Sequence, residues 1–308
     1  MGQVRQFVKL ARPKQWAKNV FVLLGPLYGL RDHPFDRQML ISACLAVGAF
    51  SLASSAVYVV NDILDAAKDR FHPRKCKRPI ASGAISERAG WVYSCMLVAA
   101  AGALMFALPA AVRMGVAAAV LAYVLNVCAY SVKLKHVVVL DVLSLSLGFV
   151  LRVVGGCFAA AMAPSTWLLN VTFFLAMFLA FGKRLGERRT LGDAASSARG
   201  VQQVYTDEIL RMFVVVTAVA TLITYAFYVQ SRDATALVKL AYLPERVNLL
   251  WLTMLPATYA MARAIVLLER GEYDDPTEMA TGDRATQLAA LLFLVLSAGA
   301  VVLGSGVV

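Results

Sequence analysis

The chain has 308 residues, of which 60% are hydrophobic and only 16% are charged, whereas about a quarter of the residues in soluble domains are charged. Together with a mean hydropathy of +0.68, this composition excludes a water-soluble globular protein. Apolar runs of about 20 residues, long enough to cross a bilayer, recur along the chain. The net charge of +11 predicts a surface that faces anionic headgroups or an anionic substrate, and the short loops argue against nucleic acid as a partner.

The apolar runs predict an all-α membrane protein with nine transmembrane helices in a single domain, residues 1–308. The expected spans are 15–31, 38–60, 91–108, 111–130, 137–161, 167–181, 212–230, 247–268 and 286–306. When residues near the end of a span are counted with the side they adjoin, 22 of the 30 Lys and Arg residues fall on the side of the N-terminus and six on the opposite side, while Arg152 and Arg263 lie deeper within spans. Because cytoplasmic loops are enriched in positive residues, we expect the N-terminus in the cytoplasm and the C-terminus outside, in the cell (inner or plasma) membrane.

The polar segment after the second span carries three aspartates at helical spacing. Asp62, Asp65 and Asp69 stand at i, i+3 and i+7, which places the three carboxylates on one helix face with Asn61 beside them. Like charges on one face repel, and a divalent cation removes that repulsion. Mg²⁺ takes oxygen ligands while it keeps waters and bridges substrate phosphates. We expect these carboxylates to contact Mg²⁺ and Asn61 to bind substrate; a solvated acidic helix end is the alternative.

A run of cations follows within nine residues, before Pro79: Arg70, His72, Arg74, Lys75, Lys77 and Arg78. Carboxylates for a metal beside cations for phosphate oxygens suit the binding of a diphosphate and its departure as a leaving group. We therefore expect Arg70, Lys75 and Arg78 to bind substrate. A basic cytoplasmic loop that only sets topology and contacts lipid is the alternative.

The pattern Asn-Asp-x-x-Asp-x-x-x-Asp at residues 61–69 resembles the first signature of the UbiA-type intramembrane prenyltransferases. Residues 130–135, Tyr-Ser-Val-Lys-Leu-Lys, resemble a second feature of that family, which implies substrate contacts for Tyr130 and Lys135. The nine spans and the cytoplasmic N-terminus agree as well. The resemblance therefore covers essentially the whole chain and implies a UbiA-type helical bundle.

The third family position departs from the common pattern. Most members carry Asp-x-x-x-Asp after the sixth span, whereas residues 182–187 here read Gly-Lys-Arg-Leu-Gly-Glu, so that Lys183 replaces an acid and Glu187 remains. With the stretches 12–19 and 72–79, this change resembles the decaprenyl-phosphate phosphoribosyltransferase branch. That resemblance implies phosphoribosyl pyrophosphate as the donor, a polyprenyl phosphate as the acceptor and pyrophosphate as a product. Such substrates bring more anion into one pocket, which Lys183 and Arg184 would balance.

Four further polar residues lie in or beside the spans. Lys18 and Asn19 begin the first span and are candidates for substrate binding, although a lysine there is also an ordinary interface anchor. Asp141 opens an apolar span, where an unpaired carboxylate is costly; it orients the ribose, accepts a proton, or pairs with a cation. Arg152 lies eleven residues on, about 16 Å away by helical rise, so it needs an anion on another helix or in the substrate. The expected catalytic residues are Asp65, Asp69, Asp141, Lys183 and Glu187.

Two rival functions stay open at this point. One is a prenyltransferase that moves a prenyl group from a polyprenyl diphosphate to an aromatic or other small acceptor, against which Lys183 argues. The other is a transporter or lipid-binding protein, which would not need three carboxylates in phase. The sequence leaves open the chain length of the acceptor, the number of metal ions and the oligomeric state.

Overall fold

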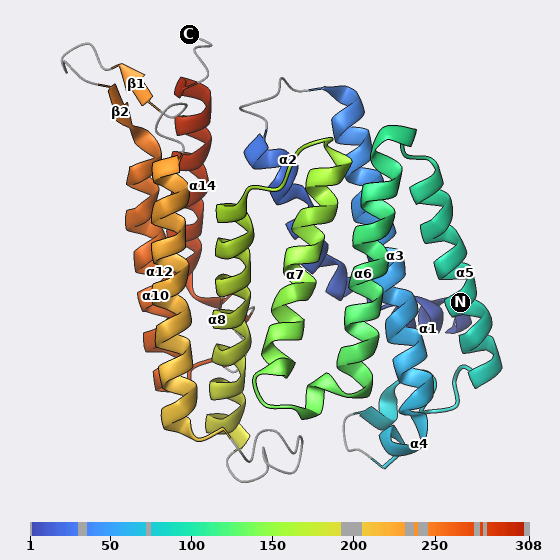
Figure 1. Ribbon diagram of the computed structural model, residues 1–308. Coiled ribbons are helices and arrows are strands. Elements are labelled where there is room, and N and C mark those ends of the chain that lie inside the picture. Colours follow the sequence, from blue (N-terminus) through green and yellow to red (C-terminus); the bar gives the residue numbers. More distant parts are fainter. Residues whose placement is uncertain are drawn as a thin grey trace. The chain divides into compact units, whose positions relative to one another are not determined.

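The structure is a computed structural model that describes residues 2–29, 36–71, 75–191, 205–231, 237–239, 246–273, 278–279 and 282–304. These residues are almost entirely helical (Figure 1). The α-helices are α1 (Gly2–Ala11), α2 (Leu24–Gly29), α3 (Arg37–Leu64), α4 (Ala66–Asp69), α5 (Glu87–Phe106), α6 (Ala110–Val132), α7 (Leu140–Ala159), α8 (Thr166–Leu191), α10 (Asp207–Ser231), α12 (Met254–Arg270) and α14 (Arg284–Gly304). The 3-10 helices are η1 (Pro13–Leu23), η2 (Lys75–Lys77), η3 (Leu134–His136) and η5 (Leu249–Thr253), and the strands are β1 (Leu237–Lys239) and β2 (Arg246–Asn248).

The chain forms two compact units, and each is described by itself. The first unit comprises Met1–Lys133 and Leu147–Pro164, and the second comprises Leu134–Ser146 and Ser165–Val308. Helix α7 therefore begins in the second unit and ends in the first.

The first unit is built around α3, which runs beside α5 and also contacts α6 and η1 (Figure 1). Its main apolar core contains Phe50, Val116 and Tyr123. A second apolar cluster, which includes Ile63 and Ile80, lies at the end of α3 where the acidic segment begins. The polar segment after α3 thus packs against a buried apolar cluster.

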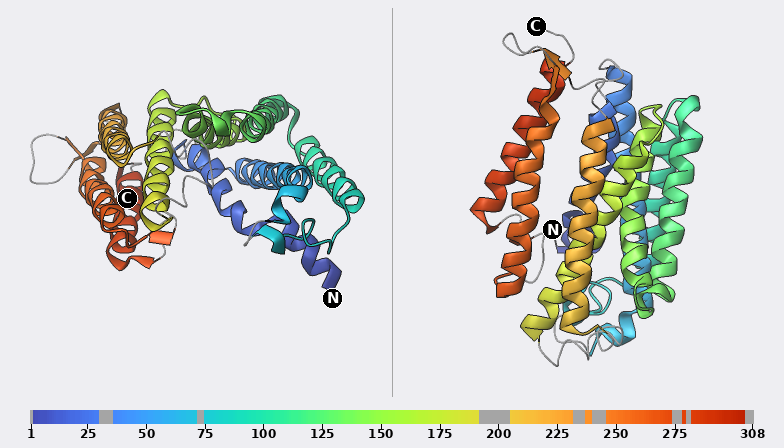
Figure 2. Two further views of the ribbon diagram at one scale, coloured as in Figure 1. Left: turned by 90° about the horizontal axis from the view of Figure 1, so that it is seen from below. Right: turned by 60° about the vertical axis from the view of Figure 1, so that its left-hand side comes forward.

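The second unit contains α8, α10, α12 and α14, which lie side by side when the helices are viewed from below (Figure 2). Its core includes Phe178, Phe181 and Leu267. The strands β1 and β2 pair antiparallel in a two-stranded sheet. At the start of α14, Asp283 accepts hydrogen bonds from the backbone and side chain of Thr286 and from Arg263 of α12, which ties these two helices together.

Seven of the described helical segments are long and apolar enough to cross a membrane: α3, α5, α6, α7, residues Thr166–Arg189 of α8, α10, and η5 continued by α12. They coincide with seven of the nine predicted spans. Apart from β1 and β2, the regular structure of the described residues is therefore helical, with several segments that can span a membrane.

The first and last predicted spans differ from these seven. Residues 15–31 were expected to form one helix, but the structure has the 3-10 helix η1 followed by the six-residue helix α2. The sequence gives a reason, since Pro26 has no N–H group to continue the hydrogen-bond ladder and Gly25 is a weak helix former. The last span corresponds to α14, whose apolar stretch Arg284–Ala300 is shorter than the other seven.

Two glycines of α7 let neighbouring helices of the first unit pack closely against it, η1 at Gly156 and α3 at Gly155. A Cβ atom at Gly156 would overlap the backbone carbonyl of Val22, and one at Gly155 would overlap the ring of Phe50. Small residues allow such close approach of backbones in membrane helices. Gly155 and Gly156 therefore serve close helix packing in this unit.

We expect Gly156→Ala to lower the free energy of unfolding by roughly 1–3 kcal/mol, because η1 must move away from α7 to admit the methyl group. The measurement is the Tm of the purified protein in detergent. Gly102→Ala in α5 is the matched control, since a Cβ atom there meets no heavy atom within 4 Å and alanine favours a helix. Equal Tm values for the two variants would contradict the close approach.

Candidate active site

The acidic segment is nearly the continuous helix that the sequence predicts. Helix α3 ends at Leu64 and α4 begins at Ala66, and Asp65 between them keeps the helical bond from its N–H to the carbonyl of Asn61 (2.9 Å). Asp69 in turn donates its N–H to the carbonyl of Asp65 (2.9 Å). The carboxylates of Asp62 and Asp69 are buried, whereas Asp65 is half-buried.

Arg78 joins the two buried carboxylates. Its Nη1 donates to Oδ1 of Asp62 (3.1 Å) and to Oδ2 of Asp69 (2.6 Å), so both acids meet at one nitrogen atom. Lys75 adds a weaker ion pair, with its Nζ 4.0 Å from Oδ1 of Asp69. Two of the cations that the sequence assigns to substrate binding thus contact the acids directly. The third, Arg70, is exposed on the same segment.

Arg12 also belongs to this cluster, although the sequence did not single it out. Its Nη2 lies 2.5 Å from Oδ1 of Asp62, and its guanidinium stacks over the ring of Tyr58 at 5.2 Å. The residue has a left-handed backbone with φ of 54° at the start of η1, a conformation that costs roughly 1 kcal/mol or more outside glycine. Its position before Pro13, in the stretch 12–19, was the only sequence signal. Arg12 and Asp62 are 50 positions apart in the sequence.

The three aspartates of this segment are candidate ligands for a divalent cation. Among the described residues, no three carboxylate, histidine or cysteine side chains are gathered as metal ligands, and the acids that Arg78 joins are Asp62 and Asp69. Asp62 and Asp69 nevertheless already converge on one positive nitrogen. Because Mg²⁺ is usually held by one or two carboxylates together with waters and substrate phosphates, these two residues fit such an ion.

Asn61 connects the acidic segment to the second sequence feature within the first unit. Its Nδ2 donates to Oγ of Ser131 (2.9 Å), the residue after Tyr130. Tyr130 itself is half-buried. Lys18 is exposed on η1, and Asn19 beside it is fully buried. The structure thus brings the two signature segments together through Asn61.

Arg152 is a buried cation whose partners in the described part of the chain are neutral. Its Nε donates to Oδ1 of Asn19 (2.7 Å), Nη1 to the carbonyl of Gly148 (2.8 Å) and Nη2 to the hydroxyl of Tyr123 (2.8 Å). The guanidinium also lies 4.3 Å from the ring centroid of Tyr123. No described carboxylate forms an ion pair with it, so the anion that its place within a span predicts is not a described side chain of this unit.

In the second unit, Asp141 and Arg184 form a buried ion pair. Oδ2 of Asp141 accepts from Nε of Arg184 (2.9 Å) and from its Nη2, and both side chains are at most 3% exposed. Asp141 therefore pairs with a cation of α8, one of the outcomes that its position at the start of a span predicted. Lys183 and Glu187, which flank Arg184 on α8, are half-buried, as is Lys135 on η3.

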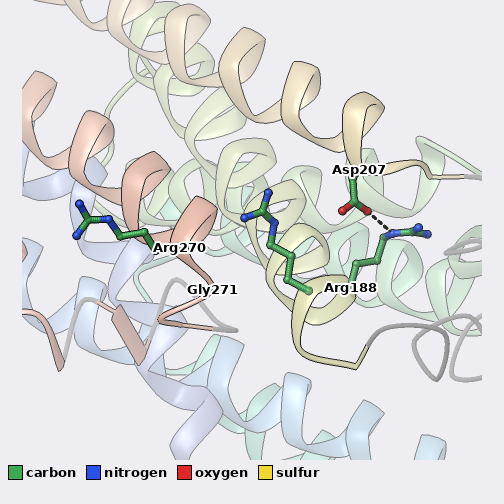
Figure 3. A pocket seen from close by; sticks show the side chains of 5 residues that line it. Arg188, Asp207, Arg270 and Gly271 are labelled. Carbon is green, nitrogen blue, oxygen red and sulfur yellow. Dashed lines mark hydrogen bonds and ion pairs between the residues drawn. The ribbon is translucent and has the colours of Figure 1, made fainter.

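A pocket of about 610 Å³ opens at the ends of α8 and α12 in the second unit, lined by Arg188, Arg189, Asp207, Arg270 and Gly271. Figure 3 shows Arg188 bonded to Asp207, with Nε 2.7 Å from Oδ1. Arg189 pairs with Glu269 (2.7 Å) and Arg270 with Glu272 (3.6 Å). Each arginine of the pocket thus has a carboxylate partner, which compensates its charge within the protein.

The sequence matches the UbiA prenyltransferase family over residues 19–281. It is 33% identical over 299 residues to a protein of Mycolicibacterium smegmatis named decaprenyl-phosphate phosphoribosyltransferase, covering 94% of this chain and 91% of that one. A protein of Mycobacterium tuberculosis with the same name is 32% identical over 301 residues, covering 96% and 94% of the two chains.

The fold resembles that of a UbiA homolog from Archaeoglobus fulgidus solved with DMAPP and Mg²⁺ bound, with a TM-score of 0.67 and 17% identity over 96% of this chain and 99% of that chain. A UbiA homolog from Aeropyrum pernix gives a TM-score of 0.60 at 16% identity, with 98% of each chain covered. The resemblance noted in the sequence is thereby confirmed at the level of both sequence and fold. The chain belongs to the UbiA prenyltransferase family.

Proposed function

We propose that the protein transfers 5-phosphoribose from phosphoribosyl pyrophosphate to a polyprenyl, decaprenyl-like phosphate in a Mg²⁺-dependent reaction that releases pyrophosphate. The observation that carries the proposal is the identity of 32–33%, over more than nine-tenths of the chain, to relatives named for this activity. The buried acids and clustered cations at the end of α3 support it, because they supply the groups that a diphosphate donor requires.

The acidic segment would bind the diphosphate of the donor. Asp62 and Asp69, assisted by Asp65, would hold Mg²⁺, which when bound supplies positive charge against the oxygens of the departing pyrophosphate. Arg78 keeps the two buried acids together despite their mutual repulsion. Arg12 and Arg78 are then placed to donate to phosphate oxygens, since guanidinium groups suit planar recognition of phosphate.

The remaining candidates of the first unit extend this site. Arg70 and Lys75 are exposed on the segment that carries the acids and would add positive charge for the donor's phosphates. Asn61 donates to Ser131, the residue after Tyr130, and Asn61 and Tyr130 would position the same substrate. Lys18, exposed on η1, would act at the membrane margin.

The acceptor brings its own nucleophile. A phosphate monoester has a second pKa near 6, so the lipid phosphate is largely a dianion at neutral pH and does not need a general base. One of its oxygens forms the bond to C1 of the ribose while the bond from C1 to the pyrophosphate oxygen breaks. The protein must therefore mainly balance charge and orient the groups. Lys135 and Lys183 would balance the phosphates, and Glu187 would orient them.

Arg152 would contribute a fixed charge for a substrate phosphate. A charged group inside a membrane protein is costly unless it is compensated, and Asn19, Gly148 and Tyr123 orient the guanidinium without neutralising it. Such a group is complementary to an anionic ligand. Asp141 and Arg184, by contrast, satisfy each other and are assigned to holding α7 and α8 in place.

We further propose that the chain acts as one UbiA-type domain that crosses the plasma membrane nine times, with its N-terminus and active site on the cytoplasmic side and its C-terminus outside. The seven long spans, the apolar segments 13–29 and α14, and the 22 to 6 distribution of Lys and Arg residues support this topology.

The first test is pyrophosphate release by the purified protein in detergent. We expect release with phosphoribosyl pyrophosphate plus decaprenyl phosphate, and its loss when EDTA removes Mg²⁺. Release only with a polyprenyl diphosphate and an aromatic acid would reject the proposal in favour of prenyl transfer.

In sealed vesicles, phosphoribosyl pyrophosphate should support the reaction from outside only when the vesicles are inverted. Activity in right-side-out vesicles would reject the cytoplasmic site.

Asp69→Asn should lower kcat by about 10²–10³-fold, because it removes a charge that holds the metal and Arg78 while it preserves the shape of the side chain. The measurement is pyrophosphate release at saturating Mg²⁺. Asp36→Asn, at the exposed cap of α3 in the same unit, is the control and should stay within about twofold of the wild type. A comparable kcat for both variants would remove Asp69 from the site.

Arg152→Gln should raise KM for one of the two substrates by about tenfold or more, because a charge-assisted hydrogen bond to phosphate is lost. Arg152→Lys, which keeps the charge but not the fork of donors, should be affected less. Arg113→Gln, which removes a guanidinium bonded to the carbonyl of Leu108, is the control. If Arg152→Gln lowers only Tm and leaves both KM values unchanged, Arg152 serves the fold alone.

A further inference from the structure

Tyr205 is a buried residue of the second unit that lies just before α10. It is 1% exposed, and the ring of Phe181 meets its own ring edge-on. Its hydroxyl accepts a hydrogen bond from the backbone N–H of Val139 (2.7 Å) and donates one to Oδ1 of Asp141 (3.0 Å). Both bonds reach a segment more than 60 residues earlier in the chain, so Tyr205 fixes a distant turn rather than its own helix.

The turn that Tyr205 contacts is strained. Val139 has a φ of 68°, which is the left-handed region, and a β-branched residue rarely adopts it. Such a conformation costs on the order of 1–3 kcal/mol and persists only where the surroundings impose it. The hydroxyl of Tyr205 accepts from the N–H of Val139. The carbonyl of Val139 accepts from the N–H groups of Val142 (3.0 Å) and Leu143 (2.9 Å). The strained peptide is therefore held from both sides.

The turn stands between two segments that carry candidate substrate residues. Lys135 lies four residues before Val139, on η3. Asp141 lies two residues after it and binds Arg184, which is flanked on α8 by Lys183 and Glu187. The carboxylate of Asp141 thus joins the turn to α8, and the hydroxyl of Tyr205 donates a further hydrogen bond to that carboxylate.

The chemistry of the phenol suits this task. Burial raises the pKa of Tyr205 to about 12, and the neighbouring Asp141 acts in the same direction, although the N–H of Val139 and the charge of Arg184 oppose it. The hydroxyl therefore keeps its proton throughout the neutral range and remains a donor to Asp141. The buried group carries one negative charge on Asp141 and one positive charge on Arg184, so it is electrically balanced.

We propose that Tyr205 is a positioning residue, whose hydroxyl holds the left-handed turn at Val139 and the Asp141–Arg184 pair and thereby sets the places of Lys135, Lys183 and Glu187. The inference rests on the proposed function insofar as those three residues contact substrate. It assigns no substrate contact to Tyr205, Asp141 or Arg184.

The test compares Tyr205→Phe, which removes only the hydroxyl, with Tyr225→Phe, which removes a buried hydroxyl bonded to Thr253 in the same unit. Two quantities are measured: kcat and KM for phosphoribosyl pyrophosphate with decaprenyl phosphate, and hydrogen exchange of the backbone amides in residues 137–143. For Tyr205→Phe we expect kcat/KM to fall by about tenfold or more and these amides to lose protection. For Tyr225→Phe we expect changes below about twofold in either quantity.

A rescue variant separates positioning from general stability. Glycine adopts the left-handed conformation without steric cost, so Val139→Gly should restore most of the activity when it is combined with Tyr205→Phe. A purely structural loss would not be repaired by removing a side chain. If Tyr205→Phe does not fold, recovery of folded, active protein in the double variant supports the proposal in the same way.

The outcomes that overturn the proposal are definite. They are unchanged kcat/KM and unchanged amide protection in Tyr205→Phe, or a double variant that is as impaired as Tyr205→Phe alone. Failure of the proposed function has a different signature, because the wild type would then release no pyrophosphate from phosphoribosyl pyrophosphate. The exchange comparison of Tyr205→Phe with Tyr225→Phe would still decide whether the hydroxyl holds the turn.

Discussion

The contact of Arg78 with Asp62 and Asp69 is the interaction on which the acidic site depends. Two buried carboxylates near the end of an apolar helix repel each other and have lost much of their hydration, so each needs a positive partner. A single guanidinium nitrogen supplies that partner to both. The same arrangement holds the two carboxylates close together, as a divalent cation between them would also require. The contact with Arg78 therefore both compensates the negative charge of the two acids and holds them where they could share a metal ion.

Local patterns in the sequence predicted much of the fold, and non-local chemistry accounts for what they missed. Apolar runs located seven spans because a helix of that length must be apolar to cross a bilayer. The first run met the same criterion of composition, but Pro26 interrupts its hydrogen-bond ladder, and the structure forms η1 and α2 instead. Hydropathy averages over such a break, since one proline hardly changes the mean.

The site shows the same division. The spacing of Asp62 and Asp69 follows from one helix, and their shared face could be derived from the sequence. Arg12 and Tyr205 could not be found in that way, because their partners Asp62 and Val139 lie 50 and 66 residues away and are brought near only by packing. Both contacts involve a residue in a left-handed backbone conformation, Arg12 itself and Val139. Strain of this kind depends on the folded surroundings and leaves little trace in composition.

Arg152 and Arg184 illustrate why residue type alone does not assign a role. Both are buried arginines, and both were candidates for substrate binding, Arg184 to balance the charge of the substrates and Arg152 because it needs an anion from another helix or from the substrate. Arg184 has Asp141 as a carboxylate partner, so an added anion would compete with an existing ion pair in a medium of low dielectric constant. Arg152 is oriented by an amide, a carbonyl and a phenol, and its charge is not cancelled by them. A substrate phosphate would complete the second arrangement and disrupt the first. For these two buried arginines, the charge of the partner therefore separates a supporting cation from one that is available to a ligand.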